Sequence, residues 1–527
     1  MVRASNAWVV GGKRSRSGLP IVANDMHLGL DAPTLWYLIA LHAPGIDVVG
    51  MSLPGAPGVV AGRTRGVAWG FTNGSVDDSD FFVERVDSAD PSRYLTPGGS
   101  APFDLRTEVI RVRGGDDDTL RVRSTRHGPV ITPVEARAGS ELLAFRWVGH
   151  EPSTTAAAIL EMNRSTTAEG FLRGLSRFSN PHQNVVFADT AGRFGYWLAG
   201  RVPLRAGGDV PLLPVPGWTG EHDWVGWLPF EEHPRVVNPD RGYVVTANNR
   251  QSRDSVSVLA SGGSWAPPYR AQRIEERILA RRVHDAASMA EIQLDVESAF
   301  AARYRTRAVD AFRGAGLDSA AAALEGWDLR ATRESREAAL FYAWIEETRA
   351  GLRRHLYGGE PGYLPLRAVE RLLEGRVADA GEIPIGAAGR ALDGVGGRPW
   401  GEIHRLVLDH PLAPVPVLGR ILGFGRGPVP REGAHFTVNV ASFPATSPPF
   451  TTTSGPSQRH VSDLADPAGR GHFVLPGGQS GWPAGPHSWD QLRLWIGGEL
   501  VPLRLEPGDR SEGGARSLVL RPLISRP

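Results

Sequence analysis

Apolar and polar residues alternate along much of the first half of the chain, as they do in half-buried strands. The alternation is clearest in Val109-Ile110-Arg111-Val112-Arg113 and Leu120-Arg121-Val122-Arg123, which predicts antiparallel strands within 107–150. Shorter apolar runs lie between Gly- and Pro-rich clusters and predict further strands. These runs are Ala7–Val10, Ile21–Ala23, Asp47–Met51, Val67–Thr72, Phe81–Glu84, Val185–Ala188 and Phe194–Ala199.

The pattern changes in the middle of the chain. Between 270 and 380, Ala, Glu and Arg dominate and apolar residues recur at helical spacing, as in Ala338–Ile345. The order β-rich, α-rich, β-rich predicts an α+β fold with a helical block inserted between parts of a sheet core. The remaining expected elements are helices at Pro33–His42 and about 154–177, and strands at Leu492–Gly497 and Leu518–Leu523.

The chain is expected to form one unit over 5–527. A length of 527 residues would allow about three domains, but there is no internal repeat and no long linker. The expected parts are a β-rich core at 5–269, a helical block at 270–380 and a return to the sheet core at 381–527. Gly and Pro make up about a fifth of the residues, against a usual share of about 12%, which favours short strands and turns.

Composition excludes several classes of protein. Without Cys there is no disulfide framework, thiolate metal site or Cys nucleophile. A formal net charge of +1 argues against a nucleic-acid or acidic-membrane partner. Lys13 is the one lysine, and its context fits neither a phosphate-binding loop nor a Ser-x-x-Lys site, since position 10 is Val10. No membrane span and no signal peptide are expected.

Common catalytic motifs are missing as well. There is no His-Glu-x-x-His or Gly-x-Gly-x-x-Gly, and Gly478-Gln479-Ser480-Gly481 ends in Trp482 where a nucleophile elbow needs Gly. Several polar segments remain, each explicable alone as a turn or a solvated loop. They are Ala4–Asn6, Asn24–Leu28, Ala68–Gly74, Asp77–Asp80, Thr246–Asn249, Tyr269–Ala271 and Gly478–Gly481.

Taken in order, these segments resemble the β subunit of the penicillin acylase family, which contains penicillin and cephalosporin acylases and acyl-homoserine lactone acylases. The resemblance runs from Ser5 almost to the end of the chain. It is carried by Ser5-Asn6-Ala7-Trp8, Asn24–Leu28, Pro54–Gly58, Ala68–Gly70, Arg126–Pro129, Pro181–Asp189, Ala247–Asn249, Tyr269–Ile274 and Gly478–Gly481.

The resemblance implies a four-layer αββα sandwich of the N-terminal nucleophile (Ntn) hydrolases and an amidohydrolase that acts through an acyl-enzyme on Ser5. A serine hydroxyl needs a nearby base, and a free α-amine, with a pKa of about 7.7–8.0, can serve as one. While Ala4 is attached, the nitrogen of Ser5 is an amide and cannot be the base. Autoproteolysis at Ala4-Ser5 is therefore the expected activating step.

The family pattern also implies the other catalytic residues. The backbone N–H of Asn73 and the side-chain amide of Asn248 would stabilise the oxyanion. His27 would orient Ser5 or modulate its amine, and Arg270 would support the site through bidentate hydrogen bonds. Catalysis needs no cofactor in this scheme.

A structural calcium ion is implied in some members, at the loop that matches Asp77, Ser79 and Asp80. Calcium takes 6–8 oxygen ligands, so this loop alone cannot complete the shell. One further ligand would come from an α subunit that this chain lacks. The only acidic residue between Asn248 and Arg270 is Asp254, which is not in register with the family ligand.

Substrate choice stays open at this point. An apolar wall from Met26, Trp36, Val59, Val60 and Phe71 would select an acyl group by size. Lipophilic amides of the β-lactam type are one substrate class, and N-acyl-homoserine lactones or lipopeptides are another. A third hypothesis is a non-catalytic remnant or binding subunit, against which the intact Ser5 and its neighbours argue.

The resemblance also implies a partner and a location. Family members are αβ heterodimers that mature in the periplasm or outside the cell. Only four residues precede Ser5 here. We therefore expect the isolated chain to be poorly soluble or inactive, and an upstream α segment to restore amidase activity.

Overall fold

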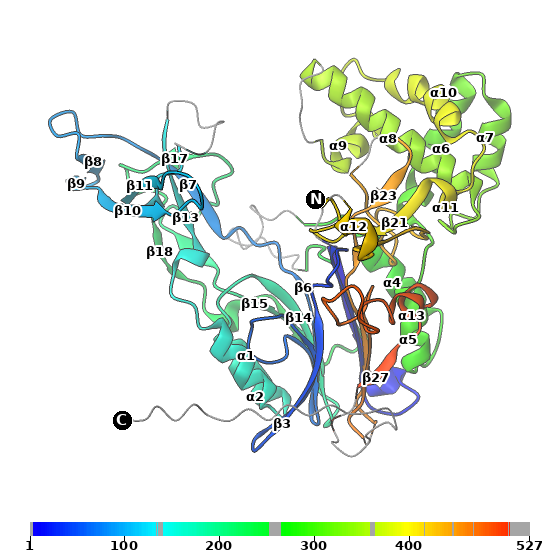
Figure 1. The fold of residues 1–527 in the computed structure, drawn as a ribbon, viewed down its shortest axis with the longest axis horizontal. Helices are drawn as coiled ribbons and strands as arrows, with labels where there is room; N and C mark the ends of the chain where they lie inside the picture. Colours follow the sequence, from blue (N-terminus) through cyan, green and yellow to red (C-terminus); the bar gives the residue numbers. More distant parts are fainter. Residues whose placement is uncertain are drawn as a thin grey trace.

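Two sheets packed face to face form the centre of the molecule (Figure 1). The computed structural model describes residues 4–132, 134, 141–251, 265–358, 364–415, 417–444, 447–466, 468–503 and 505. In this part of the chain the first sheet has the order β20-β1-β2-β25-β26-β27, with β24 also paired to β2. Its strands are β1 (Ala4–Val10), β2 (Ile21–Gly29), β20 (Tyr243–Thr246), β24 (Ser454–Pro456), β25 (Arg459–Asp463), β26 (Gly471–Val474) and β27 (Val501–Leu503).

The second sheet has the order β19-β15-β14-β6-β5-β4-β3. It is antiparallel throughout, so neighbouring strands are joined by short turns or return from an excursion outside the sheet. Its strands are β3 (Tyr37–Ala43), β4 (Ile46–Ser52), β5 (Ala61–Thr64), β6 (Val67–Asn73), β14 (Gln183–Asp189), β15 (Phe194–Ala199) and β19 (Arg235–Val237).

The alternation in β1 explains the layers. Ala7 and Val9 pack between the two sheets, whereas Trp8 and Val10 face the helices α4 (Tyr269–Leu279) and α5 (Ala286–Gln293). On the far side, α1 (Thr155–Asn163) and α2 (Ala168–Leu175) cover the second sheet, with Phe171 against Trp69 at a ring distance of 5.3 Å. The result is the helix–sheet–sheet–helix sandwich that the resemblance implies.

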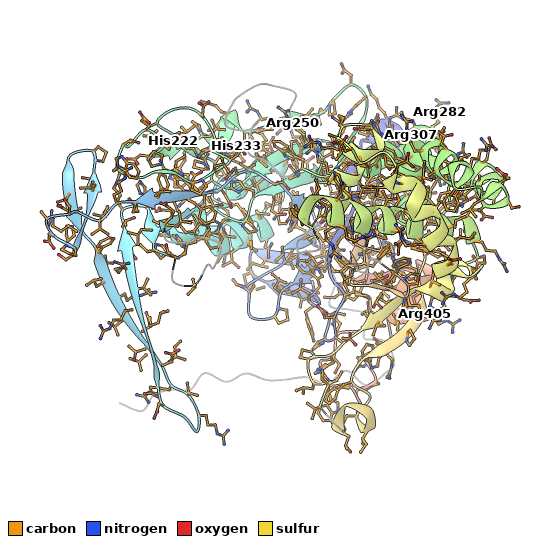
Figure 2. All side chains as sticks on the ribbon, turned by 90° about the horizontal axis from the view of Figure 1, so that it is seen from above. His222, His233, Arg250, Arg282, Arg307 and Arg405 are labelled. Carbon is orange, nitrogen blue, oxygen red and sulfur yellow. The ribbon has the colours of Figure 1, made fainter. Side chains whose placement is uncertain are left out.

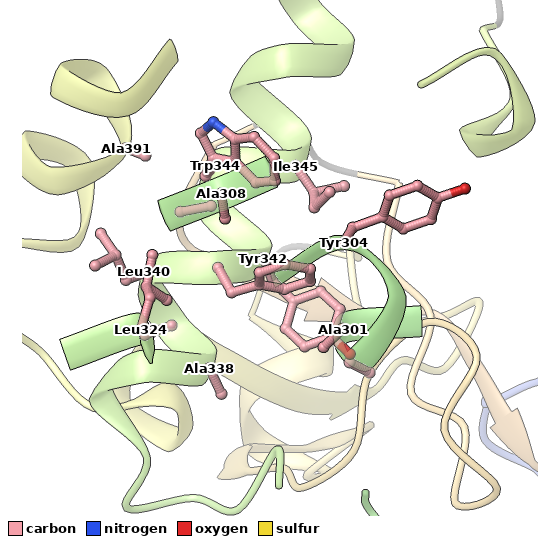
Figure 3. Close-up of a cluster of buried hydrophobic side chains, with 14 of the residues drawn as sticks. Ala301, Tyr304, Ala308, Leu324, Ala338, Leu340, Tyr342, Trp344, Ile345 and Ala391 are labelled. Carbon is pink, nitrogen blue, oxygen red and sulfur yellow. The ribbon is translucent and has the colours of Figure 1, made fainter. Parts of the chain in front are cut away.

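A separate helical lobe follows α5 in the chain (Figure 1). Its core is built from small and aromatic side chains, and Figure 3 shows Ala308 of one helix beside Leu340 and Trp344 of another. The lobe confirms the predicted helical block, which continues past 380 through α10. Its helices are α6 (Ala299–Gly314), α7 (Asp318–Glu325), α8 (Arg336–Tyr357), α9 (Leu366–Leu373), α10 (Ile383–Val395) and α11 (Trp400–Ile403).

Small sheets extend from the other edge of the sandwich. The hairpin of β10 (Asp104–Ile110) and β11 (Asp118–Thr125) projects away from the body of the molecule, as Figure 2 shows. It confirms the alternating strands predicted within 107–150. The other strands here are β7 (Ser79–Glu84), β8 (Arg93–Thr96), β9 (Gly99–Pro102), β12 (Gly128–Pro129), β13 (Leu142–Trp147), β16 (Pro203–Arg205), β17 (Val215–Pro216) and β18 (Trp224–Trp227).

The region 380–450 mixes short strands and helices. It holds the strands β21 (His404–Leu408) and β22 (Arg426–Pro430) and the short helix α12 (Leu418–Ile421), and β23 (Phe450–Thr452) pairs in parallel with β21. None of the described helices combines the length and apolarity that a bilayer crossing requires.

Three predicted elements differ in the structure. The helix expected at Pro33–His42 is mostly strand β3, because the Pro44-Gly45 turn folds it against β4 and backbone pairing outweighs helix propensity. The helix at 154–177 is two helices, since Thr167 accepts a hydrogen bond from the Gly170 N–H and starts α2 anew.

The third difference concerns the end of the described chain. Leu492–Gly497 is the helix α13 and not a strand: it buries Trp495, and Gly498 ends it in the left-handed region. The strand predicted at Leu518–Leu523 lies outside the described residues. At the other terminus, β1 runs into the short 3₁₀ turn η1 (Gly12–Arg14), where Lys13 is exposed.

Candidate active site

Ser5 lies in β1, which is bonded to β2 on one side and whose later residues pair with β20 on the other. The residue is only 3% exposed. Its hydroxyl donates to the carbonyl oxygen of Ala4 at 2.6 Å, and its backbone N–H donates to Oδ1 of Asn248 at 2.6 Å. Both atoms that an N-terminal serine would use in catalysis are thus held by specific partners.

Asn248 reaches Ser5 from the loop that follows β20. Its φ of 62° lies in the left-handed region, which Asn adopts more readily than most residues. The side-chain Nδ2 donates to the carbonyl oxygen of Asn73 at 3.2 Å, and Asn73 is the last residue of β6. The two residues predicted to stabilise an oxyanion are therefore side by side, next to the predicted nucleophile.

Arg270, in the first turn of α4, ties these parts together. Nη1 donates to the carbonyl of Ser5 and to Oδ1 of Asn6 at 2.6 and 2.7 Å, and Nη2 donates to the carbonyl of Ala247 and to Oδ1 of Asn248 at 2.6 and 3.0 Å. Burial lowers the pKa of Arg270 to about 10, which leaves the guanidinium charged at neutral pH. The side chain positions the loop of Asn248 relative to β1, as a fork of fixed geometry can.

His27 approaches Ser5 with its backbone and not with its ring. Ser5 pairs with Met26 across β1 and β2, so the Ser5 side chain shares the face of Met26, and His27 points to the opposite face. The His27 N–H lies 3.4 Å from Oγ of Ser5, whereas the ring Nε2 is 2.5 Å from Oδ2 of Asp25. Burial, with the charges of nearby arginines, lowers the pKa of His27 and keeps the ring neutral.

Asn6 and Asp25, which were not predicted as site residues, lie on the same face of the sheet as the His27 ring. Asn6 donates from Nδ2 to Oδ2 of Asp25 at 2.9 Å and accepts from Arg270 through Oδ1. Burial raises the pKa of Asp25, and Arg459, Asn6 and Arg270 oppose that rise. The signal was in the sequence: with a strand period of two, Asp25 and His27 share a face, opposite that of Asn24 and Met26.

Asn24 joins the two sheets beneath the site. Its Nδ2 donates to the carbonyls of Asn6 and Phe71 at 2.8 and 2.9 Å, which links β2 to its sheet neighbour β1 and to β6 across the interface. Gly70 makes this approach feasible, because a Cβ there would lie 2.5 Å from the Cβ of Asn24. Gly70 therefore serves the close packing of the two sheets.

The predicted apolar wall is brought together. Met26, Trp36, Val59 and Phe71 belong to one buried cluster, and Val60 packs against it. Ser5 and Met26 pair in register, so the cluster begins next to the serine. A separate cavity of about 700 Å³ adjoins the loop of Asn248 and is lined by both apolar and charged residues. Its charged lining comprises Arg250, Arg303, Arg367, Arg371, Arg376, Glu370 and Glu374.

Two of the three residues predicted to bind calcium, Asp77 and Asp80, lie next to the guanidinium of Arg205. Both carboxylate oxygens of Asp80 accept hydrogen bonds from Arg205, at 2.8 and 3.1 Å, and the Trp224 indole N–H donates to Oδ2 at 2.5 Å. Oδ1 of Asp77 accepts from the Ser79 N–H at 3.3 Å.

Across the described residues, no group of three or more His, Asp and Glu side chains is arranged to hold a metal ion. Asp254 lies outside them. The geometry of this loop therefore does not fit a bound calcium ion.

Comparison with known proteins identifies the family of the chain. The family model for penicillin amidase matches residues 2–512. An acyl-homoserine lactone acylase, QuiP of Pseudomonas aeruginosa, is 29% identical over 99% of this chain and 69% of its own length. The penicillin acylase 2 proenzyme of Pseudomonas sp. strain SE83 is 32% identical over 95% of this chain and 66% of its own. The chain thus spans about two thirds of the length of these relatives.

The fold has a solved counterpart. A thermostable penicillin G acylase from Alcaligenes faecalis superposes with a TM-score of 0.71 and 21% identity, over 98% of this chain and 100% of the matched one. That likeness confirms the predicted Ntn-hydrolase sandwich. With the match over 2–512, it shows that the chain belongs to the penicillin amidase family of amidohydrolases, which act on carbon–nitrogen bonds other than peptide bonds.

Proposed function

We propose that Ser5 is the nucleophile of an acylase that cleaves the amide bond of an N-acylated small molecule. The observation that carries the proposal is the contact between the Ser5 nitrogen and Oδ1 of Asn248 at 2.6 Å. Once this nitrogen is a free amine, the same contact holds it beside its own hydroxyl. A buried, oriented amine next to the hydroxyl is a compact nucleophile–base pair.

Maturation would use the other contact of Ser5. The hydroxyl lies 2.6 Å from the carbonyl oxygen of Ala4, so Oγ is next to the carbonyl carbon that it has to attack. Attack forms an ester between Ala4 and Oγ and breaks the Ala4–Ser5 amide bond, and the serine nitrogen takes up the hydroxyl proton. Water then hydrolyses the ester, which releases the carboxyl group of Ala4 and frees the hydroxyl beside the amine that the first step produced.

The same groups would turn over substrate. The amine accepts the proton of the hydroxyl as Oγ attacks the substrate carbonyl, and it passes that proton to the departing amine. Nδ2 of Asn248 and the backbone N–H of Asn73 are the proposed donors to the oxyanion. Nδ2 now binds the Asn73 carbonyl at 3.2 Å, and it would have to exchange that partner for the substrate oxygen. Water finally releases the acyl group from Oγ.

Two features bear on the substrate. The apolar cluster beside Met26 favours a lipophilic acyl group. The cavity next to Asn249 and Tyr269 carries more arginines than glutamates, which favours a leaving group with a negative charge. An N-acyl amide with an acidic amine portion, as in β-lactams, combines both. The relatives named as acyl-homoserine lactone acylases make long-chain acyl lactones the second substrate class to test.

The proposed enzyme is an αβ heterodimer of the periplasm or the extracellular medium. The relatives are longer than this chain by about half, and one is named as a proenzyme. An additional segment of such relatives would correspond to the α subunit.

The experiment is co-expression of this chain with an upstream α segment, followed by mass spectrometry and activity assays. We expect a chain that begins at Ser5, and hydrolysis of phenylacetyl amides in preference to long-chain acyl-homoserine lactones. Ser5→Ala should abolish both cleavage and hydrolysis. Ser17→Ala, a serine-to-alanine change in the turn after β1, should leave both intact.

Two results would contradict the proposal. The first is an active protein that retains Ala4 on Ser5, because its nitrogen would still be an amide. The second is full activity of the 527-residue chain alone, which would remove the need for the α subunit. A cleaved heterodimer that prefers acyl-homoserine lactones would keep the mechanism and change the substrate.

A further inference from the structure

Arg205 occupies a buried acidic site at the beginning of β7. It is the last residue of β16, where the pairing with β18 shifts register between Leu204 and Arg205. Such irregularities redirect a side chain out of the regular alternation. The guanidinium of Arg205 is buried and lies against Asp80 through Nε and Nη2.

Each acidic group here already has a positive or hydrogen-bonding partner. Nη2 of Arg205 is also 3.5 Å from Oδ1 of Asp77, and Trp224, which pairs with Arg205 across the strands, donates to Asp80. Asp78, the third carboxylate of the segment, lies 3.5 Å from Nδ1 of His182. A divalent ion would have to displace the guanidinium, because two cations cannot share the same carboxylate oxygens without strong repulsion.

The site also controls the chain segment next to the proposed oxyanion donor. Asn73 ends β6, and only residues 74–78 separate it from β7. The Gly74 N–H donates to the carbonyl of His182 at 3.0 Å and fixes one end of this segment. The pair of Arg205 and Asp80 fixes the other end. The pair therefore holds the far end of the segment that follows Asn73.

From this arrangement we infer that Arg205 performs the role of a structural divalent cation, and that the folded protein needs no calcium. The guanidinium supplies a fixed positive charge between Asp77 and Asp80, and a covalently attached cation is not lost by dilution or chelation. Nη1 has no hydrogen-bond partner among the described residues, so the contacts with the aspartates set the orientation of the group.

The test is the thermal stability of the purified protein, and it does not depend on catalytic activity. We expect the same Tm, within about 1 °C, in excess EDTA and in excess calcium chloride, and no bound calcium by elemental analysis after gel filtration. Arg205→Ala should lower the Tm by about 5 °C or more, because it leaves buried carboxylates without a countercharge.

Arg146→Ala is the matched control. Its guanidinium lies over the Trp224 ring at 5.0 Å, as that of Arg205 does at 5.9 Å, but it pairs with Glu151 at a half-buried site. We expect a clearly smaller fall in Tm. A fall equal to that of Arg205→Ala would assign the effect to packing on Trp224 and overturn the inference.

The inference also fails if EDTA lowers the Tm of the unmodified protein and calcium restores it, or if one equivalent of calcium remains bound. These measurements need no variant, so they decide the matter even if Arg205→Ala does not fold. An inactive protein with an unchanged Tm in EDTA would count against the proposed function and leave the role of Arg205 standing.

Discussion

Asn248 uses both ends of its amide at the site. Oδ1 accepts from the Ser5 nitrogen and from Arg270, and Nδ2 points to the end of β6. The residue is 1% exposed, so a lost hydrogen bond here is not replaced by bulk water. In the proposed mechanism a single side chain would therefore position the amine of Ser5 and donate to the oxyanion.

Replacing this amide should affect the rate more than binding. We expect Asn248→Ala to lower kcat by about 10²–10³-fold with little change in KM, because the donor acts on charge that develops in the transition state. Asn248→Gly is the control for backbone strain, since Gly accepts the φ of 62° without cost. If Asn248→Gly recovers the rate, the loss in Asn248→Ala came from strain and the donor role is wrong.

At the scale of elements, the sequence predicts the strands and helices that follow a local pattern better than those whose structure depends on a nonlocal contact. The apolar run Ala7–Val10 was sufficient to predict a strand where β1 lies, and the helical spacing of Ala338–Ile345 to predict the helix α8. Tyr37–Ala43 contains good helix formers, and only pairing with β4, a nonlocal contact, makes it a strand.

The candidate site shows the same limit. Ser5, Asn248 and Arg270 were identified by their motifs, and the structure brings them together. The contact between Arg205 and Asp80 could not be predicted from the sequence. The two residues are 125 positions apart in the chain, and the direction of the Arg205 side chain depends on an irregularity in the pairing of β16 with β18. The face to which His27 points was predictable from strand alternation once the register with Ser5 was known.

Gly70 gives a test of how closely the two sheets pack. Gly70→Ala would place a Cβ 2.5 Å from that of Asn24, so the sheets must separate or Asn24 must move. We expect a loss of about 1–3 kcal/mol in the free energy of unfolding, measured by denaturant titration. Gly226→Ala in β18, where a Cβ meets no atom within 4 Å, should change it by less than about 0.5 kcal/mol. Equal effects would contradict the close approach.

At the scale of the whole molecule, the most distinctive electrostatic feature is a set of buried neutral histidines. Burial lowers the pKa of His404, His435 and His460 to about 3, and it lowers that of His27 as well. Two buried acids act in the opposite direction, since burial raises the pKa of Glu346 to about 7 and also raises that of Asp25. The four histidines outnumber these two carboxylic acids, so lowering the pH should destabilise the fold.

The expected sign follows from proton linkage. In the unfolded chain histidines bind protons below about pH 6.5, whereas in the folded protein His404, His435 and His460 stay neutral down to about pH 3. Each one therefore removes up to about 1.4 kcal/mol of stability per pH unit as the pH falls through this window.

Denaturant titrations at several pH values would measure this slope. His404→Gln should make it shallower by about one proton, because His404 is the residue lost. A slope that stays unchanged in His404→Gln would show that His404 does not titrate on unfolding.

The position of Lys13 has a practical consequence. The chain contains one lysine, and it is exposed on η1, directly after β1 and at the opposite end of that strand from Ser5. A reagent that couples lysine side chains to a solid support would attach each molecule through the same atom. This chain would then be anchored at the far end of the strand that carries Ser5, so tethering would produce an oriented layer without any engineered tag.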